Sequence, residues 1–123
     1  PKLSKAGEDR AAKWAEILKK VDFDLIFSSD FDRTLSTAKA VAGPRQKTIQ
    51  LYDHKKLNDP DFQEKTKGKT VLVVGHSNTN PGFVNLLLEE KKYSDLKEED
   101  YGSLFIVHLA PDGTKSSEIL KIN

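Results

Sequence analysis

The segment from Thr70 to Val74 most strongly constrains the fold of this chain. It is a run of mostly β-branched residues without the apolar and polar alternation typical of a strand that has one face in water. Such a run favours a central parallel strand covered by helices on both faces. The run ends at Gly75, and Asn80-Pro81 then predicts a helix to about Glu89, because Asn is a favoured N-cap and Pro is tolerated in the first turn.

Other segments predict helices and strands that surround this strand. Amphipathic helices are expected over 6–20 and about 30–42, strands at 25–27 and 48–51, and a hairpin of 103–109 with 116–122. The charged segment 53–69 is predicted to be a loop with one helical turn. Alternating helices and strands imply helices packed on a sheet, so we expect a three-layer α/β/α fold with a mostly parallel sheet and a C-terminal antiparallel hairpin.

Composition limits the classes of function. The chain has 123 residues, enough for a single domain spanning 1–123, and no segment is apolar for long enough to cross a membrane. Cysteine is absent, which excludes disulfides, thiolate metal sites and a cysteine nucleophile. A formal charge of +1 gives no overall field that would attract nucleic acid or an anionic membrane. We therefore expect a soluble domain whose anion site, where it has one, is local.

The first strand-to-helix junction places an arginine where an anion would bind. Ser29 and Asp32 have the spacing of a capping box, which puts Arg33 in the first helical turn. A cation there is unfavourable by about 0.3–1 kcal/mol because the helix N-terminus is already positive, and a bound anion would reverse this. The alternative is a surface arginine that pairs with Asp30 or Asp32.

The second junction places His76 at the carboxyl end of the apolar strand, in the polar turn Gly75-His76-Ser77-Asn78-Thr79. Ligands of open α/β sheets bind outside these strand ends. If the two strands are neighbours in the sheet, Arg33 and His76 converge on one cationic pocket of phosphate size. The same turn approximates the Gly-x-Ser-x-Gly elbow of serine hydrolases, with Ser77 as nucleophile, but Thr79 replaces the last glycine and the only later histidine is His108, in a predicted strand.

Three segments resemble those of the histidine phosphatase superfamily, the phosphoglycerate-mutase-like group that includes short phosphohistidine phosphatases. Residues 25–38 resemble its S-x-x-x-R-T-x-x-T-A segment, residues 71–81 its V-L-V-V-G-H-S-N-T-x-P segment, and residues 3–7 the L-(S/T)-x-x-G segment before the first helix. The three occur in the order of the family. The Arg-His-Gly or Arg-His-Ala-Glu signature of its opening strand occurs nowhere in the sequence, and the chain begins at Pro1 without Met, so we expect a domain truncated at its N-terminus.

The resemblance implies a metal-independent phosphatase that needs no cofactor and works through a phosphohistidine intermediate. Arg33 and His76 match the second arginine and second histidine that hold the phosphoryl group, and Ser29 and Ser77 are the remaining candidate substrate-binding residues. The signature histidine would be the nucleophile, so this chain alone is expected not to turn over. Asp53 and Glu64 are loose candidates for the proton donor, which remains unassigned.

The resemblance also implies partners. The substrate of the intact protein would be a small phosphomonoester or a phosphorylated histidine of a protein. The absent strand would lie between the strands at 71–74 and 103–109, where a cleaved N-terminal peptide or a second copy of the chain could pair. A non-catalytic phosphate-binding or interaction domain is the competing interpretation. The sequence does not separate a cytoplasmic from an exported protein, because a secretion signal would lie upstream.

Overall fold

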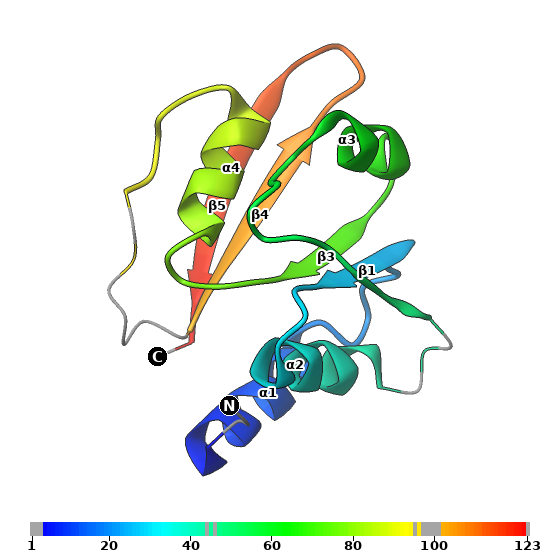
Figure 1. The fold of residues 1–123 in the computed structure, drawn as a ribbon, viewed down its shortest axis with the longest axis vertical. Coiled ribbons are helices and arrows are strands. Elements are labelled where there is room, and N and C mark those ends of the chain that lie inside the picture. The colour runs from blue at the N-terminus through cyan, green and yellow to red at the C-terminus, as the bar shows by residue number, and fades with distance from the viewer. Residues whose placement is uncertain (1–3, 44, 46, 95, 97–101, 123) are drawn as a thin grey trace.

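The computed structural model describes residues 4–43, 45, 47–94, 96 and 102–122. Helices and strands alternate along the chain (Figure 1), in the order α1 (Lys5–Ile17), β1 (Leu25–Ser28), α2 (Asp32–Ala42), β2 (Ile49–Leu51), α3 (Pro60–Thr66), β3 (Val71–Val74), α4 (Asn80–Leu88), β4 (Ser103–Leu109) and β5 (Lys115–Lys121). Residues 1–3 lie outside the described residues, and the expected truncation and part of the 3–7 resemblance depend on them. Pro44, which follows the helix expected at about 30–42, also lies outside the described residues.

The described strands form two sheets. β2, β1 and β3 make a parallel sheet in that order, with Ser28 opposite Leu51 on one side and Val74 on the other. β4 and β5 make the expected antiparallel hairpin. The α/β class with a parallel sheet and a C-terminal hairpin is confirmed. In the described sheet β1 is central and more buried, and β3, for which we predicted the central position, is hydrogen-bonded on one edge only.

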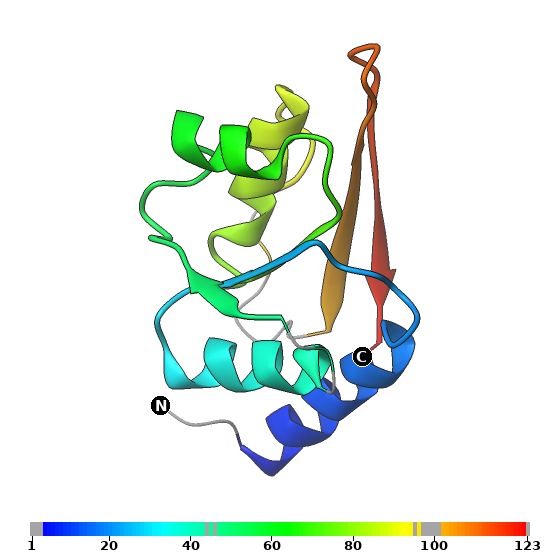
Figure 2. The same ribbon diagram turned by 90° about the vertical axis from the view of Figure 1, so that its right-hand side faces the viewer.

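Helices cover both faces of the parallel sheet, as expected. Figures 1 and 2 show α1 and α2 on one side of the sheet and α3 and α4 on the other. Alternation along β1 explains the two layers, because successive side chains point to opposite faces. Ile26 belongs to the core under α1 and α2, and Phe27 stacks with Phe62 of α3, which contacts Phe83 of α4, at ring distances of 5.2 and 5.3 Å. The first core contains Trp14, Phe23, Ile26, Ala38, Val41, Ala42 and Leu72.

The helix starts follow local capping chemistry, with two differences from expectation. α3 is a seven-residue helix where we expected a loop with one turn, because Asp59 caps it by accepting from the amide of Phe62 (2.9 Å) and Pro60 suits its first turn. The N-cap of α4 is Thr79 rather than Asn80, so the helix begins one residue earlier than predicted. The dipeptide Asp59-Pro60 was the sequence signal for α3.

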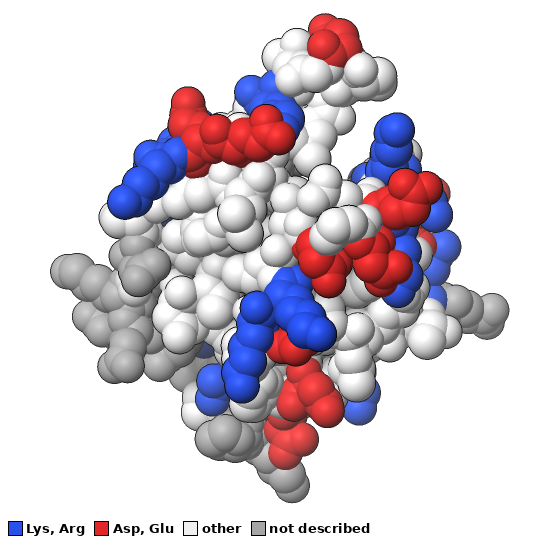
Figure 3. Space-filling model, turned by 45° about the horizontal axis from the view of Figure 1, so that its top comes forward, with Lys and Arg blue, Asp and Glu red and all other residues white. Residues whose placement is uncertain are grey.

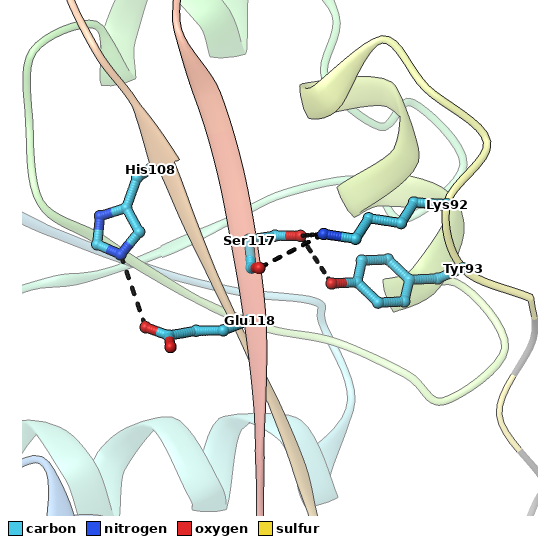
Figure 4. Close-up of polar contacts among 5 residues, drawn as sticks. All are labelled: Lys92, Tyr93, His108, Ser117 and Glu118. Carbon is cyan, nitrogen blue, oxygen red and sulfur yellow. Dashed lines mark hydrogen bonds and ion pairs between the residues drawn. The ribbon is translucent and has the colours of Figure 1, made fainter.

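Polar contacts join the hairpin to the segment that follows α4 (Figure 4). The Tyr93 hydroxyl lies 2.6 Å from the Ser117 hydroxyl on β5, and Lys92 Nζ donates to the same Ser117 oxygen at 3.0 Å. His108 of β4 lies across the hairpin beside Glu118, 3.8 Å from its carboxylate, and both side chains are exposed. Among the helices that the structure describes, none has the length and apolar character needed to span a bilayer.

Candidate active site

The candidate site lies at the carboxyl ends of the three parallel strands. Ser29 follows β1, His54 lies in the connection after β2, and His76 follows β3. Two backbone hydrogen bonds extend the strand pairing into these turns: the Ser29 amide donates to Val74 O (3.2 Å) and the Tyr52 amide donates to Ser28 O (3.1 Å). Three segments that are distant in sequence are thereby aligned at one edge of the sheet.

A hydrogen-bonded chain of hydroxyl groups fixes the His76 ring. Ser29 Oγ lies 2.9 Å from His76 Nε2 and 3.0 Å from Thr34 Oγ1, while Thr34 Oγ1 is 2.9 Å from Ser29 O and 3.0 Å from Phe31 O. Carbonyl oxygens only accept, so the Thr34 hydrogen goes to one of them and Ser29 donates to Thr34. Ser29 Oγ is then left to accept from His76 Nε2. The proton of neutral His76 therefore sits on Nε2, and Nδ1 carries none.

This arrangement replaces the predicted capping box. The N-cap of α2 is Phe31, which provides no side-chain hydrogen bond, so the expectation that Ser29 caps the helix is wrong. The reason is that the fully buried Ser29 hydroxyl is already engaged by Thr34 and His76. Arg33 does lie in the first turn, as predicted. The backbone N–H groups in the first turn of α2 therefore receive no hydrogen bond acceptor from the side chain of the N-cap residue.

Arg33 shares its environment with His76. The guanidinium carbon lies 5.7 Å from the centre of the Phe31 ring, and the His76 ring meets the same Phe31 ring edge-on at 5.0 Å. The alternative interpretation, in which Arg33 pairs with Asp30 or Asp32, is not what the structure shows: no carboxylate of the described residues lies within ion-pair distance of it. An exposed cation without an acidic partner remains beside an imidazole.

The electrostatics of the site disfavour a charged His76. Partial burial lowers the pKa of His76 below its usual value, and the positive charge of Arg33 and the neighbouring His54 lower it further. Each of these effects opposes a second positive charge at the same place. A bound anion has the opposite effect, because its charge favours the imidazolium.

His54 is a residue that none of the sequence motifs singled out. Its ring lies 5.2 Å from the His76 ring and 5.5 Å from the Phe31 ring, edge-on to both. The sequence feature that could have indicated His54 is its position just after the strand at 48–51, because ligands bind at the carboxyl ends of parallel strands. Within the segment 53–69, the sequence indicates only Asp53 and Glu64, as loose candidates for the proton donor.

Comparison with known proteins decides the family. The sequence profile of the histidine phosphatase superfamily (branch 1) matches residues 1–64, slightly more than half of the chain. The chain belongs to the histidine phosphatase superfamily. The resemblance noted from residues 25–38 is thus confirmed, and no match to a curated protein was found.

Solved structures with the same fold include several phosphatases. A candidate α-ribazole-5'-P phosphatase from Escherichia coli K-12 has a TM-score of 0.73 at 15% identity, over 98% of this chain and 84% of that one. A phosphoserine phosphatase from Entamoeba histolytica, solved with 3-phosphoglyceric acid, has 0.69 at 19% identity, over 99% and 85%. A mycobacterial glucosyl-3-phosphoglycerate phosphatase, solved with inorganic phosphate, has 0.64 at 13% identity, over 98% and 87%. At these identities the likeness establishes the fold.

The remaining candidate residues, Asp53, Glu64 and Ser77, differ in how close they lie to the site. Asp53 and His54 line an open hollow of about 490 Å³ together with Asp30, Phe31, Leu51, Tyr52 and Lys55. Glu64 is exposed on α3 and does not line that hollow. Ser77 is half-buried, and no hydrogen bond joins its side chain to another described residue, so the geometry gives it no base. Of the two carboxylates considered as proton donors, Asp53 is the one at the site.

Gly75 allows the side chains of Tyr52 and Asn80 to approach the backbone closely next to His76. A Cβ at this position would collide with the Tyr52 hydroxyl and would lie 2.7 Å from Asn80 Oδ1. The Tyr52 hydroxyl is buried with no hydrogen-bond partner among the described residues, and burial raises the pKa of Tyr52 to about 12. Packing therefore requires a glycine at position 75, and the next residue, His76, makes the polar contact with Ser29.

Surface charge is mixed over the face shown in Figure 3, where acidic and basic side chains lie in small groups with uncharged surface between them. No large basic patch appears on that face, in keeping with the formal charge of +1. The cationic character of the site is thus local, as the sequence led us to expect.

Proposed function

We propose that Arg33 and His76 hold the phosphoryl group of a phosphomonoester, and that the intact protein hydrolyses it through a phosphohistidine intermediate. The observation that carries the proposal is the position of Arg33, which has no acidic partner among the described residues and shares the Phe31 ring with an oriented His76. Membership of the histidine phosphatase superfamily supports it.

The chemistry of phosphoryl transfer fits this pair of side chains. The transition state spreads negative charge over three equatorial oxygens, so catalysis depends on positioning and on cationic donors. The planar Arg33 guanidinium can hold two oxygens at once. His76, anchored through Nε2, can present Nδ1 to a third oxygen when it is protonated. A carboxylic acid such as Asp53 would supply the proton for the leaving oxygen.

The nucleophile is proposed to come from another strand. In this sequence the three histidines are His54, His76 and His108, and none of them follows an arginine. In the proposed cycle, a histidine nitrogen attacks phosphorus as the bond to the leaving oxygen breaks, and the oxygen takes a proton. Water then attacks phosphorus, breaks the P–N bond and releases inorganic phosphate, which regenerates the histidine.

We propose that this strand inserts between β3 and β4. Within the described residues, β3 is hydrogen-bonded only to β1 and β4 only to β5. Val74 of β3 and Leu104 of β4 are both partly buried against the same core, so both open edges border one apolar region. A strand there would deliver a side chain next to His76. An N-terminal segment of the same protein is the occupant we favour, with a strand from a second copy as the alternative.

The substrate class is proposed to be a small phosphomonoester or a protein phosphohistidine. The structural neighbours include proteins named for phosphoserine and glucosyl-3-phosphoglycerate, which supports the phosphomonoester. Phe31, which contacts both Arg33 and His76, also lines an open hollow with Asp53 and His54, and an open hollow suits either a small molecule or an exposed side chain.

The test compares the 123-residue chain with a longer protein that carries its upstream segment. We expect hydrolysis of 4-nitrophenyl phosphate and an acid-labile phosphohistidine only in the longer protein, with kcat/KM lowered about 100-fold or more by Arg33→Ala or His76→Ala. Phosphate binding without turnover in both proteins would instead support a phosphate-binding domain. Esterase activity lost in Ser77→Ala and kept in Arg33→Ala would support a serine hydrolase.

A further inference from the structure

Three aromatic rings and one guanidinium form a compact cluster at the site. Phe31, His54 and His76 meet edge-on in all three pairs, at ring distances of 5.0, 5.2 and 5.5 Å, and Arg33 lies over the Phe31 ring. The side chains come from three different connections, after β1, β2 and β3. A large apolar side chain is also 38% exposed at the N-cap of α2, a position that usually carries a small polar residue. The Phe31 ring is thus placed to hold the two imidazoles.

The cluster is electrostatically incomplete without an anion. Two imidazoles and a guanidinium lie against the same Phe31 ring, and no described ion pair involves Arg33, His54 or His76. Protonation of either ring places like charges side by side, which is unfavourable. A dianionic phosphoryl group at this spot would turn each of those repulsions into an attraction and could accept hydrogen bonds from all three side chains.

We propose that His54 is a third side chain that contacts the bound phosphoryl group, held in place by the Phe31 ring. This inference rests on the function proposed above, because it takes the anion held by Arg33 and His76 as given. It assigns a role to the connection after β2, which lies outside all three sequence segments that resemble the superfamily.

The other charged groups around His54 bear on its effect. Asp30, from the connection after β1, and Asp53 and Lys55, from its own segment, line the same hollow, and Arg33 approaches from α2. Around His54, the negative charges of Asp30 and Asp53 oppose the positive charges of Lys55 and Arg33, so a bound anion would meet both repulsion and attraction there.

The experiment is a titration with inorganic phosphate, followed by the histidine ring signals in NMR spectra of the 123-residue chain. Because the sequence has three histidines, each can be assigned with one variant, and exposed His108 on the hairpin is an internal control. We expect the His54 and His76 signals to move together with one dissociation constant while His108 stays fixed. His54→Gln should raise that constant about 3- to 10-fold. His108→Gln should leave it unchanged.

A second variant separates contact from packing. His54→Phe keeps a ring against Phe31 and removes the hydrogen-bond donor, so it should weaken phosphate binding as much as His54→Gln does. Full affinity in His54→Phe would overturn the proposed contact. Movement of His76 alone, with normal affinity in His54→Gln, would also overturn it and would leave the proposed function standing. No movement of either ring, or equal movement of all three, would overturn both.

Discussion

The Ser29 hydroxyl and the His76 ring are hydrogen-bonded at 2.9 Å although 47 positions separate them in sequence. The parallel pairing of β1 with β3, with Ser28 opposite Val74, creates this contact. Ser29 lies one residue and His76 two residues beyond the paired strands, where each segment turns towards its helix and brings its side chain to the other. The register of two strands thus brings the imidazole to the buried Ser29 hydroxyl, and this hydroxyl engages its Nε2 atom.

Ser29→Ala is expected to release the His76 ring. The variant removes the acceptor for Nε2, so the neutral ring should become a mixture of tautomers, visible in ring nitrogen chemical shifts. Phosphate affinity should fall about 2- to 10-fold, the equivalent of one neutral hydrogen bond. Ser28→Ala is the matched control, because Ser28 is equally buried and bonds the Ser29 carbonyl instead. Identical tautomer ratios in both variants would contradict the role given to Ser29.

Arg33→Gln is expected to lower the affinity for phosphate and to raise the free energy of unfolding. Removing a cation from the first turn of α2 should increase the free energy of unfolding by about 0.3–1 kcal/mol. Phosphate affinity should fall about 10- to 100-fold, because a hydrogen bond to a charged group contributes about 1.5–3 kcal/mol. Lys39→Gln, in the last turn of the same helix, should decrease stability and leave affinity unchanged. Urea unfolding and phosphate titration measure both, and a destabilised Arg33→Gln would show that Arg33 has a structural partner.

The sequence predicted the fold well because its signals were local. The apolar run at 71–74, the Arg33 junction and the hairpin turn each follow from neighbouring residues, and the structure has all three. The central position of the 71–74 strand was not predictable in this way. Strand order depends on contacts between segments distant in sequence, and β1 rather than β3 has a partner on both edges in the described sheet.

The site was predictable only where a motif marked it. Arg33 and His76 were placed together by the rule that ligands bind at the carboxyl ends of parallel strands. His54 was missed because it lies in a charged segment whose residues gave no periodic pattern. Ser29 was expected to cap a helix, and its hydroxyl instead holds His76, since a buried hydroxyl bonds whichever partner the tertiary fold brings near.

The lowered pKa of His76 predicts a dependence of stability on pH. The folded state binds this proton less readily than the unfolded state, so the stability that neutral His76 provides is complete above about pH 6.5, the usual histidine value. It is lost as pH falls through the lowered pKa of the folded state. Relative to His76→Gln, the wild-type chain should therefore lose stability between neutral and mildly acidic pH.

Inorganic phosphate should reverse this trend. A bound anion favours the imidazolium, so phosphate should raise the His76 pKa and take up protons when it binds at mildly acidic pH. Calorimetry in buffers of different ionisation enthalpy measures that uptake, and urea unfolding at each pH measures stability. Because phosphate can itself release a proton on binding, the comparison is with His76→Gln, and an equal net proton exchange in both proteins would be incompatible with an imidazole that contacts the anion.

The effects of Gly75→Ala and Tyr52→Phe on the free energy of unfolding are expected to be non-additive. The added Cβ at Gly75 would collide with the Tyr52 hydroxyl, so Gly75→Ala alone should lower the free energy of unfolding by about 1–3 kcal/mol. Tyr52→Phe should raise it by about 1 kcal/mol, because it removes a buried hydroxyl that has no partner among the described residues. In the double variant the cost of Gly75→Ala should be smaller, since Asn80 Oδ1 is then the only remaining close contact of the two. A double-mutant cycle by urea unfolding tests this, and an equal cost of Gly75→Ala in both backgrounds would show that the two residues do not meet.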